Sequence, residues 1–119
     1  MQFSAFNNNA ISFEVNQGTL AFTTNVTVNR ITNTDGNVFG AQIIGNILTN
    51  NGGGLVKTTG NVRVGKITNQ GQIRCEGSII AKTDASDGHF TQDSNDSAFT
   101  YAGGLDANNI YIKSGKVFI

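Results

Sequence analysis

The sequence predicts an all-β fold of short strands, arranged as a wound β-helix or β-prism-like shape or as a compact β-barrel or sandwich. The first observation is a recurring unit in which Val or Ile follows a glycine after one residue; four such units begin at Gly60, Gly65, Gly71 and Gly77, spaced by 5, 6 and 6 residues. The second is composition, because Asn, Gly and Thr supply 16, 15 and 13 of the 119 residues while Pro and Trp are absent. Glycine permits tight corners and Thr favours strands, so we expect the chain to bend every few residues.

The length of 119 residues predicts one domain. Phe3 and Phe6 precede a polar break at residues 7–9, which predicts an N-terminal anchoring arm over residues 1–9. Residues 10–119 are expected to form the all-β domain. Because the two phenylalanines are too apolar for a free tail, we expect them to pack against another subunit or a capsid partner.

Residues 10–31 are predicted to form a β-meander. Apolar and polar residues alternate there on both sides of a short connection that contains Gly18. Period-two alternation around such a connection is typical of a hairpin or meander with one buried face. The expected strands lie near residues 10–15, 19–23 and 25–31.

Residues 36–82 contain most of the glycine repeats and are predicted to be the wound region. Alternation about the glycines places one set of side chains in the core, namely Val38, Val62, Val64, Ile67, Ile73 and Ile79, and directs Arg63, Lys66 and Arg74 outward. The glycine spacing is irregular elsewhere, which indicates a degenerate repeat rather than one fixed period. Such short strands are hard for one chain to bury, so three chains sharing a core are expected.

The remaining residues are predicted to form a polar loop at 83–97 and terminal strands over 98–119. The loop is rich in Asp, Ser and Thr and contains His89, the one histidine of the chain. Cys75, the one cysteine, lies in phase with Ile73 and is expected to be a buried small side chain.

The formal net charge is zero, but the charges are unevenly distributed along the chain. A basic tract carries Lys57, Arg63, Lys66, Arg74 and Lys82, and an acidic tract follows with Asp84, Asp87, Asp93, Asp96 and Asp106. Charge runs are usually solvated faces, which is one interpretation. The other is that the basic tract of one subunit meets the acidic tract of a neighbour. The candidate interface residues are then Phe3, Phe6, Arg63, Lys66, Arg74, Asp84, Asp87, Asp93 and Asp96.

The sequence does not predict an enzyme or a cofactor. His89 lies beside Asp87, but the Gly-x-Ser-x-Gly turn that would accompany a catalytic serine is missing from the sequence. One cysteine excludes an internal disulfide and a four-cysteine zinc site. The loop aspartates do not follow EF-hand spacing, although an oxygen site for calcium built from Asp84, Asp87, Asp93 or Asp96 stays open.

Neither nucleic acid nor a membrane is an expected partner. The aromatic residues do not interleave with the basic tract, so no base-stacking platform is visible in the sequence. The N-terminus lacks the basic and apolar pattern of a signal peptide, and no run of 18 apolar residues occurs. We therefore expect a protein made in a cytoplasm and soluble there.

The Gly-Asn-Val and Gly-Asn-Ile units at Gly36, Gly45 and Gly60, in an Asn/Thr/Gly-rich and proline-free chain, resemble the β-structured fibre, spike and capsid-decoration proteins of tailed bacteriophages. The resemblance covers residues 18–82. It implies a virion protein that is commonly trimeric, is made in the host cytoplasm and binds the major capsid protein or another virion protein. A capsid decoration (cement) protein or a short head fibre is expected, because one docking face suffices for it.

Three alternatives stay open. The chain is also similar in length and texture to a component of a receptor-binding tail fibre or spike. A self-assembling β-helix of the bactofilin kind shares the Gly-x-Val/Ile units. A carbohydrate-binding β-module, which would recognise a host surface glycan, is favoured by Tyr101 and Tyr111 as stacking platforms.

Overall fold

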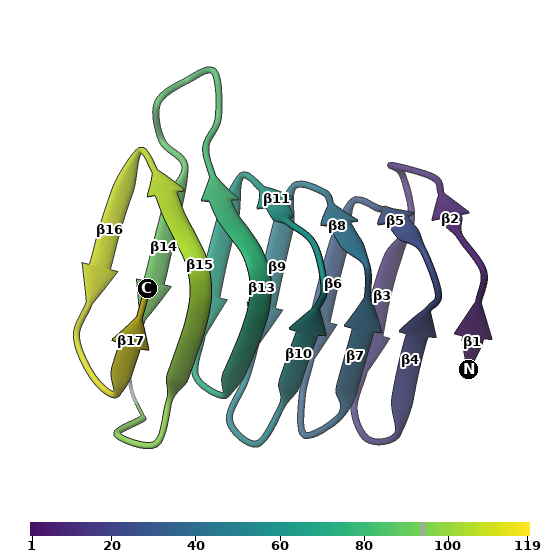
Figure 1. Cartoon of the computed structure of the whole chain (residues 1–119), viewed down its shortest axis with the longest axis horizontal. Coiled ribbons are helices and arrows are strands. Elements are labelled where there is room, and N and C mark those ends of the chain that lie inside the picture. The colour runs from purple at the N-terminus through teal and green to yellow at the C-terminus, as the bar shows by residue number, and fades with distance from the viewer. Residues whose placement is uncertain (94) are drawn as a thin grey trace.

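The chain forms a parallel β-solenoid in a computed structural model that describes residues 1–93 and 95–119 (Figure 1). Two sheets, one of 11 strands and one of 6, wind around a common axis, and every printed strand pair is parallel. Each of the 6 strands of the second sheet belongs to one turn. The termini lie at opposite ends of the solenoid. The described residues contain no helix, which confirms the all-β prediction and selects the β-helix among the shapes expected.

The first sheet consists of β1 (Gln2–Phe3), β2 (Phe6–Asn7), β4 (Thr19–Phe22), β5 (Asn25–Thr27), β7 (Asn37–Gly40), β8 (Gln42–Ile44), β10 (Leu55–Thr58), β11 (Val62–Val64), β13 (Gln72–Ala81), β15 (Phe99–Ala107) and β17 (Lys116–Phe118). The second consists of β3 (Ser12–Val15), β6 (Arg30–Asn33), β9 (Ile47–Asn50), β12 (Lys66–Asn69), β14 (His89–Gln92) and β16 (Asn109–Ile112). The first sheet has two halves. The lower half contains β1, β4, β7, β10 and β17, the upper half contains β2, β5, β8 and β11, and β13 and β15 run through both (Figure 1).

The register of the strands defines the length of a turn. Consecutive partners in one column of the lower half are Leu20, Val38, Val56, Ile73, Thr100 and Val117, so the turns measure 18, 18, 17, 27 and 17 residues. The long turn holds the segments on either side of β14, and the one before β14 projects from the solenoid (Figure 1). The predicted polar loop at 83–97 is therefore interrupted by β14, and its Ser94 lies outside the described residues.

Glycine spacing is irregular because the glycines occupy different corners of a turn. Gly60, Gly65 and Gly71 lie between β10 and β11, β11 and β12, and β12 and β13, and Gly77 lies at the bend of β13. Together they complete one circuit. One turn earlier, Ala41 and Asn46 take the places of Gly60 and Gly65, so the glycine pattern breaks while the winding continues. The expectation of a degenerate repeat is corrected to a nearly constant turn with one insertion.

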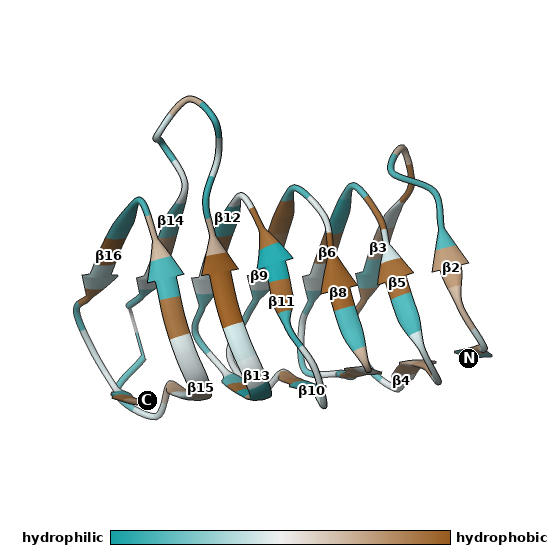
Figure 2. Cartoon of the chain, turned by 45° about the horizontal axis from the view of Figure 1, so that its top comes forward, coloured by the Kyte–Doolittle hydropathy of each residue, from teal (hydrophilic) through white to brown (hydrophobic). Residues whose placement is uncertain are grey.

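One chain closes its own core. The six residues predicted to be buried are at most 3% exposed, and Cys75 is fully buried, as predicted. Arg63 and Arg74 are exposed and Lys66 is partly exposed. Hydrophilic and hydrophobic residues alternate along the strands (Figure 2), so each strand buries one face. Sharing a core among three chains is therefore not required for burial.

The front of the chain differs from the prediction. Strands β3 and β6 pair in parallel, as do β4 and β7, so residues 10–31 belong to the same winding and form no meander. Alternation predicted the strands but not their partners, because a hairpin and a parallel turn have the same period.

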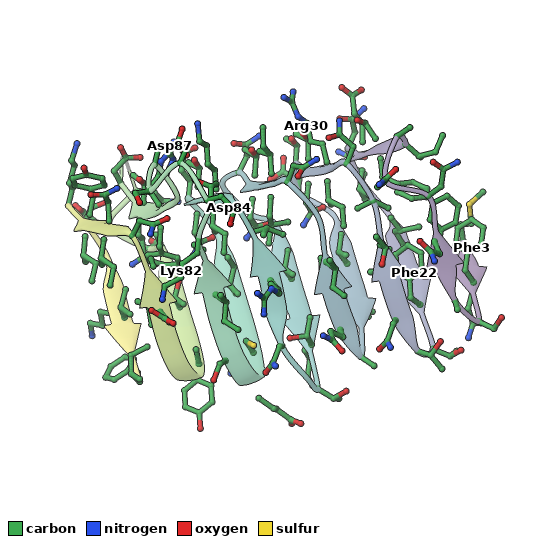
Figure 3. All side chains as sticks on the ribbon, turned by 90° about the horizontal axis from the view of Figure 1, so that it is seen from above. Phe3, Phe22, Arg30, Lys82, Asp84 and Asp87 are labelled. Atoms are coloured by element: carbon green, nitrogen blue, oxygen red, sulfur yellow. The ribbon has the colours of Figure 1, made fainter. Side chains whose placement is uncertain are left out.

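Residues 1–9 are the first part of the winding rather than a separate arm. Phe3 lies 5.5 Å from both Phe6 and Phe22, measured between ring centroids, and its ring is nearly parallel to that of Phe22 (Figure 3). Phe13 completes the group, 5.1 Å from Phe6. The expected packing partner of Phe3 and Phe6 is thus found within the chain itself.

Candidate functional site

The outer face of the lower half brings together aromatic and basic side chains from five turns. One outward column contains Phe39, Lys57, Arg74, Tyr101 and Phe118, which are consecutive partners on β7, β10, β13, β15 and β17. The adjacent outward column contains Asn37, Leu55, Gln72, Phe99 and Lys116. We call these ten residues the aromatic–basic face.

Contacts within this face hold its side chains in place. The guanidinium carbon of Arg74 lies 5.3 Å from the ring centroid of Phe99, a cation–π distance. The rings of Phe99 and Phe118 are 5.5 Å apart and tilted by 41°. Tyr101 and Phe118 are 49% and 50% exposed, so their rings are available to a ligand. A large exposed ring flanked by an ordered cation is a feature of binding surfaces.

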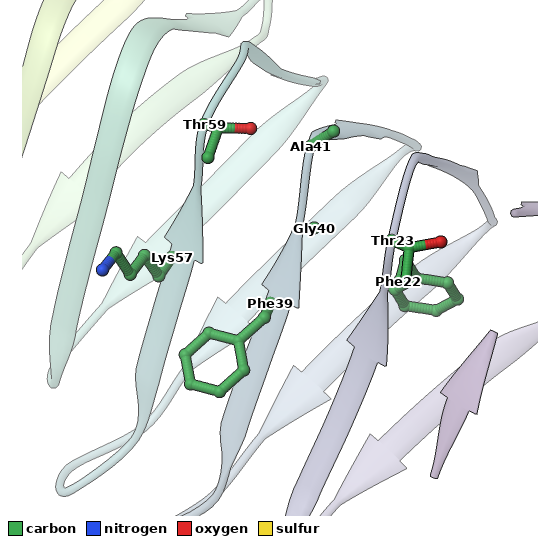
Figure 4. Close-up of a pocket in the computed structure, with 7 residues that line it drawn as sticks. All are labelled: Phe22, Thr23, Phe39, Gly40, Ala41, Lys57 and Thr59. Carbon is green, nitrogen blue, oxygen red and sulfur yellow. The ribbon is translucent and has the colours of Figure 1, made fainter. Parts of the chain in front are cut away.

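A shallow hollow of about 340 Å³ adjoins one end of the aromatic–basic face (Figure 4). Its lining residues are Phe22, Thr23, Phe39, Gly40, Ala41, Lys57 and Thr59. Gly40 helps to form it, because a Cβ at this position would meet Ile43 and Phe22 at 3.8 and 3.9 Å and would fill part of the space. Phe39 and Lys57 belong to both the hollow and the face.

Sequence reasoning missed this face because its residues are 16 to 27 positions apart along the chain. The prediction that no aromatic residue interleaves with the basic tract is true of the sequence but not of the fold, where Arg74 lies between Lys57 and Tyr101. Only the turn length could have revealed the column.

The second sheet presents a different outer face. Its central outward column holds four threonines and a tyrosine, namely Thr32, Thr49, Thr68, Thr91 and Tyr111. Tyr101 and Tyr111 therefore lie on different sheets, so they do not form one stacking platform. His89 is on β14 beside Lys66 of β12 rather than in a free loop.

The charged tracts do not form two faces. Lys57 and Arg74 are in the lower half of the first sheet, Arg63 is in the upper half, and Lys66 is on the second sheet. Asp84 is exposed before β14, whereas Asp96 is exposed after it. The winding distributes consecutive residues around the axis, so a run in sequence does not become a patch.

Two ion pairs close within the chain. Lys66 Nζ lies 3.7 Å from Asp87 Oδ2, and Lys82 Nζ lies 2.9 Å from Asp106 Oδ2. Lys82, Asp84 and Asp87 lie in the same region of the molecule (Figure 3). A hydrogen bond from the Thr83 hydroxyl, assisted by the charge of Lys66, lowers the pKa of Asp87 below its ordinary value of 3.8. Contact of these residues with a neighbouring chain stays a prediction.

The open alternative of a calcium site gains no support from the geometry. Asp87 and Asp93 lie beyond opposite ends of β14, and six residues of extended chain span about 20 Å. In the part of the chain that the structure describes, no group of three His, Cys, Asp or Glu side chains is placed to hold a metal ion.

The last turn leaves apolar side chains uncovered. Ile110 and Ile112 on β16 are 46% and 51% exposed although they occupy inward-facing columns. On the preceding turn, Phe90 and Gln92 in the same columns are fully buried. This end surface, with Leu105 and Ile119 beside it, is the second candidate interaction surface.

The comparisons with protein-family models, with curated proteins and with solved structures find no match for this chain. Among the described residues, no helix has the length and apolar character to cross a membrane. Function must therefore be argued from the surfaces of the solenoid.

Proposed function

We propose that this chain is a structural protein that acts by assembling with copies of itself and docking on a particle, as a capsid decoration protein or short head fibre of a tailed bacteriophage does. The observation that carries the proposal is the apolar end surface of the last turn. A parallel solenoid is a rigid scaffold whose terminal strands have unpaired backbone groups on one edge, and such edges readily pair with another chain.

The two ends of the solenoid match in the character of their inward columns. One column begins at Phe13 and ends at Ile110, and another begins at Val15 and ends at Ile112. A third begins at Phe6 on β2 and ends at Leu105 on β15. If the last turn of one copy stacks on the first turn of another, apolar side chains meet in all three columns.

The number of copies is a separate part of the proposal. A head-to-tail contact is heterologous and builds either a closed ring or an open fibre. A closed trimer would fit the virion function, whereas an open polymer would favour the bactofilin-like alternative. The burial of the core by one chain removes one reason for expecting a trimer, so the expectation now rests on the resemblance alone.

Light scattering across a concentration series tests the proposal. We expect the wild type to self-associate and the Ile112→Asp variant to stay monomeric, because a carboxylate would be buried in the contact. Ile47→Asp is the matched control, since Ile47 faces outward between Arg30 and Lys66 and should tolerate the charge. A wild type that is monomeric at every concentration would contradict assembly through this end.

The location on a particle needs its own measurement. Electron micrographs of virions labelled with an antibody against the chain should show label on the capsid. Label restricted to the tail would favour the tail-fibre alternative, and virions that carry no label would contradict a virion function.

A further inference from the structure

We propose that the aromatic–basic face binds an acidic polysaccharide that lies across the strands, along the solenoid axis. This site is on the side of the solenoid and is independent of the end surface on which the proposed function rests. Either proposal can therefore fail without the other.

The face combines the three kinds of group that recognise an acidic sugar chain. Exposed rings at Tyr101 and Phe118 can stack on the apolar faces of sugar rings. Lys57, Arg74 and Lys116 can pair with carboxylates, and the amides of Asn37 and Gln72 can hydrogen-bond to hydroxyl groups. These groups come from adjacent strands, so they form one continuous surface.

The dimensions suit an extended chain rather than a compact ligand. Neighbouring strands are about 4.8 Å apart, so the four steps from Phe39 to Phe118 span roughly 19 Å. The strands and the contact of Arg74 with Phe99 fix the positions of the binding groups before a ligand arrives. Preorganised groups lose little conformational entropy on binding.

The charge density favours an acidic glycan over single-stranded nucleic acid. A stacked nucleic acid strand carries one phosphate per 3.4 Å, or about six phosphates over the same roughly 19 Å. The face offers three cations over this length, and the exposed Glu76 lies close to Arg74 on β13. The net charge of zero gives no long-range attraction to a polyanion. A sugar polymer with carboxylates on only some of its rings matches these intermittent cations better.

Calorimetric titration against defined polymers tests the proposal. The acidic probes are polygalacturonate, alginate and polysialic acid; the comparison probes are methyl-esterified polygalacturonate, dextran and oligo(dT). We expect at least one acidic glycan to bind, and its affinity to fall as salt rises. Lack of binding across the acidic probes, equal binding of the methyl ester, or tighter binding of oligo(dT) would each overturn the proposal.

Matched tyrosine variants locate the site. Tyr101→Ala should weaken binding about tenfold, because an exposed stacking ring is lost. Tyr111→Ala is the control, since Tyr111 has the same exposure, 48% against 49%, but lies on the other sheet. Lys57→Gln should weaken binding as well, whereas Lys113→Gln, beside Tyr111, should leave it unchanged. Equal effects of Tyr101→Ala and Tyr111→Ala would overturn the placement of the site.

Discussion

Asn50 donates a hydrogen bond from Nδ2 to Oδ1 of Asn69 at 3.0 Å, and both side chains are completely buried. The same bond links Asn33 to Asn50 at 3.0 Å and Asn69 to Gln92 Oε1 at 3.1 Å. Four turns are thus connected by one amide ladder inside the core. Nδ2 of each asparagine also reaches a backbone carbonyl, as Asn50 does at Gly54 and Gln72, so the ladder satisfies polar groups of the nearby corner.

The ladder should be a major source of stability. Replacing Asn50 with Ala removes hydrogen bonds to Asn33, Asn69 and two carbonyls and leaves a cavity, so we expect a loss of about 2–3 kcal/mol in the free energy of unfolding. Asn46→Ala is the control, because Asn46 makes an equivalent amide bond to Asn29 on the surface. That variant should lose less than about 0.5 kcal/mol. Urea denaturation measures both, and equal losses would show that the buried ladder adds nothing special.

Glycine should be needed at the corner occupied by Gly71. A Cβ there would lie against the carbonyl oxygen of Gly54 and 2.8 Å from that of Asn51, and these backbone atoms of the preceding turn have little freedom to move. We expect Gly71→Ala to cost about 1–3 kcal/mol in thermal or urea unfolding. Gly52→Ala should be nearly neutral, because the nearest atom to its Cβ would be Asn95 Nδ2 at 3.6 Å. The prediction is wrong if the two variants unfold alike.

The carboxyl group of Asp87 should titrate below its ordinary pKa of 3.8. Because the folded-state pKa is lowered, the bonds of Asp87 are fully present above pH 3.8 and are lost as the pH falls through the lower folded value. Carbon NMR of the side chain measures the pKa directly. Thr83→Val should raise it, since the hydroxyl is the main cause, and Lys66→Gln should raise it less and lose its effect in high salt. A pKa unchanged by Thr83→Val would refute this assignment.

The first turn should be necessary for stability. Deleting residues 1–8 removes β1 and β2 and uncovers Phe13 and Phe22, so the truncated chain should unfold more easily than the full chain. Sequence analysis had placed these residues in a separate arm. Phe3→Ala should cost about 2 kcal/mol, and Ile11→Ala, at a more exposed position of the same end, should cost less than about 1 kcal/mol. Truncation without any change in melting temperature would restore the idea of a detachable arm.

Local features of the sequence predicted the local features of the fold. Alternation about Gly60, Gly65 and Gly71 identified the buried residues, because the direction of a side chain in a strand depends only on its immediate position. Pairing could not be predicted in the same way, since every strand bonds to one about 17 residues away.

The amide ladder did leave a signal that the analysis missed. An apolar residue, a threonine and an amide recur as Ile31-Thr32-Asn33, Leu48-Thr49-Asn50, Ile67-Thr68-Asn69 and Phe90-Thr91-Gln92. Aligning these triplets gives the turn length, and the turn length in turn gives the column of Phe39, Lys57 and Arg74. The glycines obscured it because three corners contribute to one pattern.

Each turn of this solenoid contacts mainly the turn before it and the turn after it. Stability in such an array is a sum of nearest-neighbour terms, and an interior unit can be repeated without moving the others. Residues 36–53 are one complete storey, because Leu55 at the start of the next storey pairs with Asn37. Inserting a second copy of them would lengthen the molecule by about 4.8 Å and carry one more asparagine into the ladder. The molecule is thus a ruler whose length could be reset by whole-storey duplication.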